Sequence, residues 1–413
     1  MIINEGKIHI KAWTDDLIQP EYAGALSQAI NLSNLPFAFH HVAIMPDTHQ
    51  GFGMCIGGVL ATKDVIIPNA VGVDIGCGMC AVKTSLTDID KDTLKKIMGE
   101  IRKTIPVGAE HNKKVCDFEL MPDLKEHNIT EDTIVWKEFE NARTQLGTLG
   151  GGNHFEEIQK GSDGHIWIMI HSGSRNLGKK VADYYNDLAT KLNEKWHSSV
   201  PSKWELAYLP LESDEGKRYL QEMQYCVDFA LANRKLMMER IKDIFVSFFP
   251  KKAIGYETET KGKTIDDGSY PSIYFDPIIN IAHNYASLEN HFGENVWVHR
   301  KGATLARKDT IGIIPGSQGT KSYIVRGKGN PDSFMSCSHG SGRMMSRSKA
   351  KELLDLETEK KLLDDQGIIH GIRTVKDLDE AAGAYKNIST VMSNQSDLVE
   401  ILVELSPLAV IKS

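Results

Sequence analysis

The chain has 413 residues, of which 41% are hydrophobic and 25% charged, an ordinary globular composition with room for one large domain or two moderate ones. Its formal net charge of −7 excludes a global attraction to nucleic acid, so any nucleic-acid site has to be a local basic patch. No apolar run reaches the length of a membrane span, and the start of the chain lacks the features of a secretory signal, so we expect a cytoplasmic protein with no membrane partner.

Helix-like and strand-like segments follow one another along the chain. Apolar residues at helical spacing predict a helix from Asp92 to Ile105, with Asp92 as its N-terminal cap. The same pattern predicts helices at 180–196, 217–249 and 349–363. Short β-branched runs that end at glycine-rich turns predict strands at 41–45, 59–67, 165–170, 295–299, 312–314 and 398–412.

The order of these segments indicates the fold class. There is no regular β-α-β alternation and no repeat of fixed period, which favours an α+β domain over a doubly wound sheet. The polar segments 103–144 and 198–215 look like surface excursions from one domain, because candidate site residues lie on either side of each. Since there is no clear linker, we expect residues 1–413 to form a single interlaced domain.

A glycine-rich segment, Val71-Gly-Val-Asp-Ile-Gly-Cys-Gly-Met-Cys80, places the carboxylate of Asp74 three residues before the thiol of Cys77. Glycines let a backbone turn sharply and approach a ligand closely, so both side chains can face one site. Isolated histidines recur downstream in glycine-rich or turn-like segments, at His154, His171, His283 and His339. A thiolate, a carboxylate and several imidazoles together predict a metal centre for one or two ions.

Other interpretations of the cysteines stay open. Six cysteines in a chain of this size are too few for a disulfide framework, which favours reduced thiols. Cys77 could pack as a small hydrophobic residue, or it could form a redox pair or half of a zinc knuckle with Cys80. There is no second Cys-x-x-Cys, however, and residues 71–83 look extended, whereas a redox motif requires the start of a helix.

Further glycine-rich segments are typical of anion-binding loops. Three glycines precede Asn153 and His154, so that several N–H groups can point at an anion while His154 serves as a ligand and Glu157 as a hydrogen-bond acceptor. The planar guanidinium of Arg175, which follows His171, suits a phosphate. The plainer alternatives are a flexible loop at 150–154 and an ordinary surface ion pair for Arg175.

The loops 315–319 and 336–343 also look like phosphate cradles. Neither matches the P-loop or the dinucleotide-binding fingerprint, which argues against an ordinary nucleotide site of those kinds. His339 is flanked by small residues that expose it, so it could be a metal ligand or a nucleophile. For His283 taken alone, a core-facing, hydrogen-bonded histidine is the default interpretation.

Six motifs occur in this order along the chain: Met45-Pro-Asp-x-His49, Val71-Gly-Val-Asp-Ile-Gly-Cys-Gly78, Leu146-Gly-Thr-Leu-Gly-Gly-Gly-Asn-His-Phe155, His171-Ser-Gly-Ser-Arg175, Pro315-Gly-Ser-x-Gly319 and Ser338-His-Gly-x-Gly-Arg343. In type, order and coverage, which extends down to Lys412, they resemble the RtcB family of RNA ligases. The resemblance implies an RtcB-type fold, in which mixed β-sheets are surrounded by helices.

The resemblance also implies a GTP- and Mn2+-dependent ligase that joins an RNA 3′-phosphate or 2′,3′-cyclic phosphate to a 5′-hydroxyl. His339 would be the catalytic nucleophile that carries GMP as a covalent guanylyl-histidine. Two Mn2+ ions, bridged by Cys77, would be held by Asp74, Cys77, His154, His171 and His283. The guanylate pocket would be lined by Asn153, His154, Phe155, Glu156, Glu157, His283, Asn284, Pro315, Gly316, Ser317, Gln318, Ser322, His339, Gly340, Ser341, Gly342 and Lys412.

Two rivals share much of this evidence. A metal-dependent phosphodiesterase that opens cyclic phosphates would use the same ligands without a guanylate role for His339 or Lys412. An RNA-end-binding protein without catalysis would need no intact nucleophile. Thiolate and imidazole ligands ordinarily favour zinc or another late metal, so the choice of Mn2+ rests on the resemblance.

Partners and regulation are less well defined by the sequence. Cationic residues near the motifs could form the local RNA-binding patch: Arg175, Lys179, Lys180, Arg300, Lys301, Arg343, Arg347 and Lys349. We hypothesise that a Cys77–Cys80 disulfide switches off metal binding under oxidation. The physiological RNA, the oligomeric state and the need for an activating protein partner are not specified by the sequence.

Overall fold

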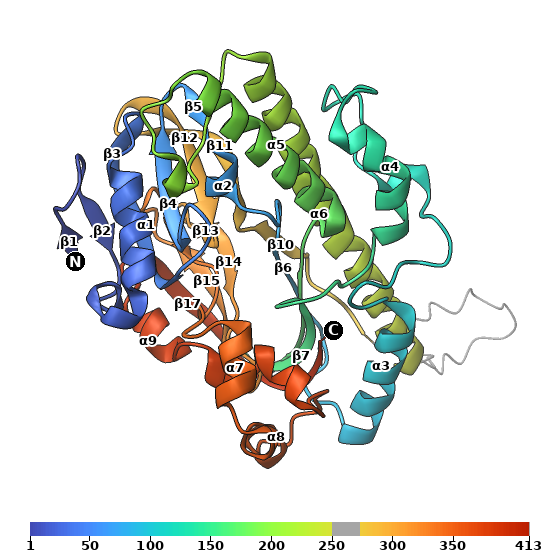
Figure 1. Ribbon diagram of the computed structural model, residues 1–413. Coiled ribbons are helices and arrows are strands. Elements are labelled where there is room, and N and C mark those ends of the chain that lie inside the picture. Colours follow the sequence, from blue (N-terminus) through green and yellow to red (C-terminus); the bar gives the residue numbers. More distant parts are fainter. Residues whose placement is uncertain (250–272, 413) are drawn as a thin grey trace, which may run out of the picture.

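Two large β-sheets form the centre of the computed structural model, which describes residues 1–249 and 273–412 (Figure 1). The strands of the six-stranded sheet lie in the order β1 (Ile2–Ile3), β2 (Ile10–Ala12), β3 (Ala38–His49), β4 (Ile56–Thr62), β12 (Glu294–Lys301) and β11 (Asn284–His291). Of these neighbours only β2 and β3 run parallel. Helix α1 (Ala23–Ser33) covers one face of this sheet, and an apolar cluster shared with the second sheet covers the other. Both faces of β3 and β4 are therefore buried.

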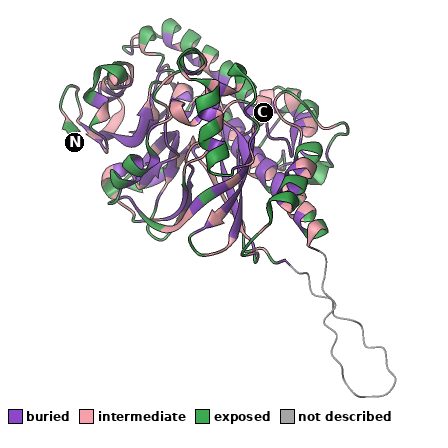
Figure 2. Cartoon of the chain, turned by 90° about the horizontal axis from the view of Figure 1, so that it is seen from below, coloured by how far each residue is buried: buried purple, intermediate pink, exposed green. Residues whose placement is uncertain are grey.

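The second sheet has seven antiparallel strands, in the order β10 (Ile279–Ala282), β6 (Gly78–Lys83), β8 (Ile166–Ser172), β7 (Phe155–Gly161), β17 (Val399–Lys412), β15 (Ser322–Gly327) and β14 (Ile311–Ile314). Apolar side chains of α3 (Lys91–Thr104) and α6 (Asp214–Phe248) pack on one face. Leucines and isoleucines of residues 354–381 pack on the other face. Figure 2 shows the resulting pattern, with buried strands inside and exposed helices at the rim.

The shortest connection between the two sheets is a single residue. Strand β10 ends at Ala282 in the second sheet and β11 begins at Asn284 in the first, so His283 lies where the chain passes from one sheet to the other. Beside this junction, β13 (Ala303–Leu305) pairs with β16 (Ser336–Ser338), and β5 (Val65–Ile66) pairs with β9 (Leu209–Pro210) at the periphery. Strand ends from both sheets therefore meet around His283.

Helices surround the sheets. Figure 1 shows α5 (Arg175–Lys195) beside α6, and the two pack through a shared apolar cluster. Further α-helices are α2 (Pro68–Val71), α4 (Ile134–Gln145), α7 (Arg347–Leu353), α8 (Leu356–Asp365) and α9 (Ile388–Ser393). Short 3₁₀ helices lie at Asp16–Ile18, Pro20–Tyr22, Phe118–Leu120, Ser202–Trp204, Pro331–Ser333, Val375–Glu380 and Ala382–Ala384. Within the described ranges, no helix combines the length and apolar character needed to cross a membrane.

The α+β class is confirmed, and so are most of the predicted elements. Four local predictions are wrong. The strand predicted at 59–67 is divided into β4 and β5, which belong to different sheets. The helix predicted at 349–363 is divided into α7 and α8, because Asp355 caps the start of α8 by accepting a hydrogen bond from Thr358 N at 2.8 Å. The cap of α3 is Asp90, whose carboxylate accepts from the main chain of Asp92 and Thr93. The segment 103–144, expected to be irregular, contains most of α4.

Candidate metal and nucleotide site

A cavity of about 380 Å³ lies where the strand ends of the two sheets meet. Most of the side chains that the sequence predicts for the site line it, although they come from segments up to 338 residues apart, between Asp74 and Lys412. The predicted residues in its wall are Asp74, Cys77, Asn153, Phe155, Glu157, His171, His283, Asn284, Pro315, Gly316, Ser317, Gln318, His339, Gly340, Ser341, Gly342 and Lys412.

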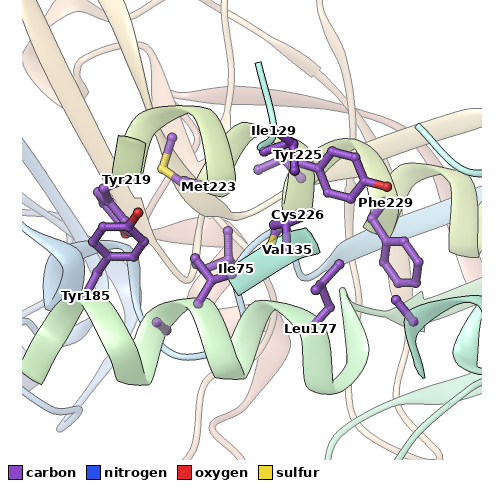
Figure 3. Packing of buried hydrophobic residues seen from close by; sticks show 14 of the residues in the cluster. Ile75, Ile129, Val135, Leu177, Tyr185, Tyr219, Met223, Tyr225, Cys226 and Phe229 are labelled. Atoms are coloured by element: carbon purple, nitrogen blue, oxygen red, sulfur yellow. The ribbon is translucent and has the colours of Figure 1, made fainter. Parts of the chain in front are cut away.

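The loop between α2 and β6 carries Asp74 and Cys77. It is anchored by Ile75, which lies in the apolar cluster between α5 and α6 (Figure 3). Gly76 has a φ of +76°, and a Cβ there would lie 2.8 Å from Val227 Cα on α6, so no other residue fits without displacing the helix. Because the loop is packed this closely, Asp74 and Cys77 occupy fixed positions at the floor of the cavity.

Two histidines converge on the thiol. Cys77 Sγ lies 3.4 Å from His154 Nε2 and 3.3 Å from His171 Nε2. The three ligand atoms all lie within 4.8 Å of one another, and all three residues are buried. His154 immediately precedes β7 and His171 lies on β8, so the pairing of these adjacent strands sets their separation. Asp74 Oδ2 completes the group at 3.1 Å from His154 Nε2.

The hydrogen bonds of these rings fit a bound cation. His171 Nδ1 donates to Asn153 O at 3.1 Å, and His154 Nδ1 donates to Leu149 O at 3.0 Å, since a carbonyl can only accept. In the neutral rings both Nε2 atoms are then lone pairs, and they face the thiol and the Asp74 carboxylate. A cluster of acceptors of this kind is the arrangement expected around a metal ion, with main-chain carbonyls orienting the ligating rings.

His283 is the fourth histidine at this place. Its main-chain N donates to Cys77 O at 2.8 Å, and its ring centroid lies 5.2 Å from that of His171. The buried Nδ1 of His283 has no hydrogen-bond partner among the described residues. Because an unpaired buried nitrogen is costly, this atom is a good candidate for a further metal ligand.

Burial shapes the protonation of the site. It raises the pKa of the Cys77 thiol well above its usual value and lowers the pKa of His171 and His283. Burial alone would also raise the pKa of Asp74, but in the metal-free site a hydrogen bond from His154 and the positive charge of that ring, when it carries its second proton, hold the pKa below the usual value. A divalent cation favours thiolate, carboxylate and neutral imidazole, so metal binding would release the thiol proton.

A buried arginine supports the ligand strands from behind. Arg234 on α6 donates from Nη1 to Gly76 O at 3.0 Å and to Ser172 O at 2.9 Å, which are the residues next to Cys77 and His171. It is fully buried, and no carboxylate lies within ion-pair distance of it in the described part of the chain. Its charge therefore favours negative charge on the neighbouring ligands. Sequence reasoning missed Arg234, because it lies inside a long amphipathic helix with no motif around it.

His339 is held by a carboxylate beside His283, whose ring centroid lies 4.8 Å from that of His339. Asp47 Oδ2 accepts hydrogen bonds from His339 Nδ1 at 2.6 Å, from His339 N at 3.0 Å and from Gly340 N at 3.3 Å. Since Nδ1 carries the proton, Nε2 keeps its lone pair. Gly342 permits this approach, because a Cβ there would lie 2.0 Å from Asp47 O. The sequence contained Asp47 in a motif but gave it no role.

The rest of the cavity carries charged and polar groups suited to a nucleotide. Lys412 Nζ lies 3.6 Å from Glu380 Oε2, and Glu380 also pairs with Arg343 and Arg347 at 3.1 and 2.9 Å. Burial raises the pKa of Glu157, which faces the same space, to about 8. Glu380 is thus the anion that fixes three cations near the cavity, and no motif in the sequence pointed to it.

Three predicted pocket residues lie outside the cavity wall. His154 lies behind Cys77, in the metal-ligand group. Ser322 Oγ accepts hydrogen bonds from Gly316 N and Gln159 Nε2, both at 3.1 Å, and so supports the 315–318 loop from below. Glu156 lies on the opposite face of β7, where its buried carboxylate has no hydrogen-bond partner among the described residues and burial raises its pKa to about 8.

Two cations assigned to the RNA-binding patch are buried. Arg300 is fully buried on β12 and forms an ion pair with Glu289, so its prediction as a surface contact is wrong. Lys301 is also buried and donates to Phe52 O and Asn69 O. Arg175 reaches inward, with Nη1 3.3 Å from His154 Nδ1, beside the ligand group. Lys179 remains an exposed cation.

The hypothesis of a cysteine switch finds no support in the geometry. Cys77 and Cys80 are both free thiols. Cys80 packs in the apolar cluster beneath α3 and α6, away from the cavity, and burial raises its pKa to about 12. A buried thiol of this kind reacts slowly with oxidants.

Comparisons with known proteins identify the family of this chain. Residues 28–413 match the family model described as tRNA-splicing ligase RtcB. The RNA-splicing ligase RtcB of Escherichia coli K12 is 38% identical over 98% of this chain and 97% of its own length. The tRNA-splicing ligases RtcB of Nanoarchaeum equitans and Thermococcus kodakarensis are 32% and 31% identical, over 100% and 94% of this chain and 97% and 90% of their own lengths. The chain therefore belongs to the RtcB family.

Proposed function

We propose that this protein is a GTP- and Mn2+-dependent RNA ligase that joins RNA 3′-phosphate or 2′,3′-cyclic phosphate ends to 5′-hydroxyl ends. One observation carries the proposal. His339 is fixed by Asp47 with its Nε2 free, in the same cavity as Cys77 and His171, on which the buried His154 also converges. The RtcB family of the chain and the RNA-splicing names of its relatives support the ligase over a phosphodiesterase.

The metal ligands would be Asp74, Cys77, His154, His171 and His283. Bound Mn2+ would neutralise charge on the triphosphate and so help pyrophosphate to leave. The donor set alone also suits zinc, so the choice of manganese rests on the family.

His339 and Asp47 account for the nucleophilic step. Nε2 of His339 attacks the α-phosphorus of GTP, an N–P bond forms, and the bond to the pyrophosphate oxygen breaks. The ring becomes positively charged in this step, and the Asp47 carboxylate beside Nδ1 stabilises that charge. Lys412 and the side chains of the 315–318 loop line the same space and would contact the phosphates and the guanosine.

The joining steps follow from the same intermediate. An oxygen of the RNA 3′-phosphate attacks the guanylyl phosphorus, and His339 leaves with its lone pair restored. The RNA 5′-hydroxyl then attacks the activated 3′-phosphate, so a phosphodiester bond forms and GMP departs. A 2′,3′-cyclic phosphate would first be opened by water to give the 3′-phosphate.

The decisive experiment is incubation with α-labelled GTP and Mn2+, followed by denaturing electrophoresis, for the wild-type protein and His339→Ala. We expect a labelled band that is acid-labile, base-stable and absent from the variant. His299→Gln is a suitable control, because His299 is buried away from the cavity and should keep the label. If the metal binds but no label forms, while cyclic phosphates are still opened, the protein is a phosphodiesterase.

A further inference from the structure

The loop that carries Phe52 is held rigidly by its main chain. Gln28 exchanges two hydrogen bonds with Gly51, at 2.7 and 3.0 Å, and Gly53 N donates to Glu205 Oε2 at 3.1 Å. Phe52 O accepts from both Met54 N and Lys301 Nζ. Groups from α1, β12 and the segment before β9 thus fix the backbone on either side of Phe52.

The ring of Phe52 is nevertheless left in the open. It is 69% exposed, the highest value among the large apolar residues of the described chain. A benzyl ring gains nothing from exposure to water, and a flexible loop would let it fold back onto the surface. A pinned backbone that presents an exposed aromatic ring is the arrangement of a contact site.

The position of this ring relates it to the reaction centre. Phe52 lines the same cavity as the ligand candidates Asp74, Cys77 and His171. Lys412, one of the residues proposed for the guanylate, also lines it. Because the ring of Phe52 is both mostly exposed and part of the cavity lining, it can contact a second substrate that enters the cavity from solvent.

A positive charge lies directly beneath the loop. Lys301 Nζ donates to Phe52 O and to Asn69 O at 2.9 Å, and no carboxylate lies within ion-pair distance of it in the described ranges. The ammonium is buried but lines the cavity. An aromatic ring next to an unneutralised cation is the combination that binds a single-stranded nucleotide, because the ring stacks on the base and the cation attracts the phosphate.

We propose that Phe52 stacks on the base of a terminal RNA nucleotide and so positions that end at the metal site. This inference rests on the proposed function, because it takes RNA as the substrate. The base could belong to the 3′-phosphate strand or to the 5′-hydroxyl strand, since the same stacking serves either. Stacking on a ring is tolerant of base identity, so no preference for one base is expected.

The test is the binding and joining of short RNAs by the wild type, Phe52→Ala and Phe52→Trp. We expect Phe52→Ala to raise the Kd for one of the two RNA ends about tenfold or more, measured without GTP by fluorescence anisotropy. Guanylylation should stay at the wild-type level, and Phe52→Trp should restore binding. Phe118→Ala is the matched control, because Phe118 is 55% exposed and does not line the cavity.

RNAs that lack the terminal base decide whether the base is the partner. An abasic 3′-terminal or 5′-terminal nucleotide should raise the Kd of the wild type by the same factor as the Phe52→Ala substitution does. The same abasic RNA should not raise the Kd of Phe52→Ala any further. The strand for which this holds is the one that Phe52 contacts. If the two losses add independently, the ring contacts something other than a base, such as a protein partner, and the proposal fails.

Other outcomes also separate this inference from the proposed function. If Phe52→Ala binds both RNA ends as the wild type does, or if guanylylation falls together with binding, Phe52 is not a stacking residue. Because binding is measured on unreacted RNA without GTP, it remains informative even if the wild type forms no guanylyl-histidine. In that case the ligase mechanism is contradicted, while the stacking role of Phe52 is still decided by the binding data alone.

Discussion

Two buried polar clusters in this protein are built in opposite ways. Around Glu289 the charged groups are paired. The carboxylate accepts hydrogen bonds from Arg300, His291 and Ser287, and Arg300 Nε donates to Ser336 Oγ at 2.9 Å. Although burial opposes it, Arg300 and His291 hold the pKa of Glu289 well below its usual range. The charges of this cluster neutralise one another.

In the cluster around Cys77, by contrast, several buried polar groups lack a suitable hydrogen-bond partner. Lone pairs of His154 and His171 face a thiol and a carboxylate, and His283 Nδ1 has no partner among the described residues. Buried polar groups are nearly always satisfied within a protein, so a cluster that is not satisfied marks the place where something else binds. The contrast between the two clusters separates a structural ion pair from a candidate reaction centre.

The largest effect should come from breaking the complete cluster. Glu289→Ala leaves the Arg300 guanidinium buried without an anion, and we expect it to lower the free energy of unfolding by about 3–5 kcal/mol. Chemical denaturation followed by circular dichroism measures this loss. Glu357→Ala, which removes one side of an exposed pair with Lys360, should cost less than about 1 kcal/mol. Equal losses for the two variants would remove the distinction.

A substitution in the cluster around Cys77 should affect metal binding rather than the stability of the metal-free protein. Cys77→Ser should leave the stability of the metal-free protein nearly unchanged, because the thiol makes no contact that the fold requires. The wild type should gain about 2.7 kcal/mol when free Mn2+ is one hundred times its Kd, and the variant should gain much less. Thermal unfolding with and without Mn2+ checks this prediction. A large loss of stability in the metal-free variant would make Cys77 a structural residue.

The smallest effect concerns a buried histidine that is fully paired. His299 Nε2 accepts from Ile67 N at 3.0 Å and Nδ1 donates to Leu60 O at 3.2 Å, and burial lowers its pKa to about 4. The unfolded chain binds this proton near pH 6.5, so stability falls as the pH drops from 6.5 to 4, by about 1 kcal/mol per pH unit near pH 5.5. Chemical denaturation at a series of pH values should show a smaller slope for His299→Gln than for the wild type.

Much of the fold could be predicted because its signals are local. The strands at β4, β12 and β17 contain β-branched runs, and α3 and α6 have continuous apolar faces. Helix α4 was missed because its buried apolar face is short. Only Val135, Phe139 and Ala142 form it, and polar and charged residues surround them in the sequence. The pairing of strands distant in sequence could not be predicted, since it depends on contacts that no local pattern records.

The candidate site shows the same limit. Motifs pointed to Cys77 and His339 because glycines and small residues surround them. Their supporting partners lack such surroundings: Asp47 lies 292 residues from His339, and Arg234 is one residue of a long helix. Arg300 was misassigned because a cation at the end of a strand looks exposed in sequence. Only the packing of β12 between β4 and β11 shows that it is buried.

Strand β17 has a consequence for how the protein comes into being. It lies between β7 and β15, yet both of those strands precede it in the chain by 70 residues or more. During synthesis the two halves of the seven-stranded sheet must therefore wait, with open edges, until residues 399–412 emerge from the ribosome. Lys412 arrives with that strand. A nascent chain therefore cannot assemble the cavity before this strand is made. Until then, the unpaired strand edges are exposed and available for chaperones to bind.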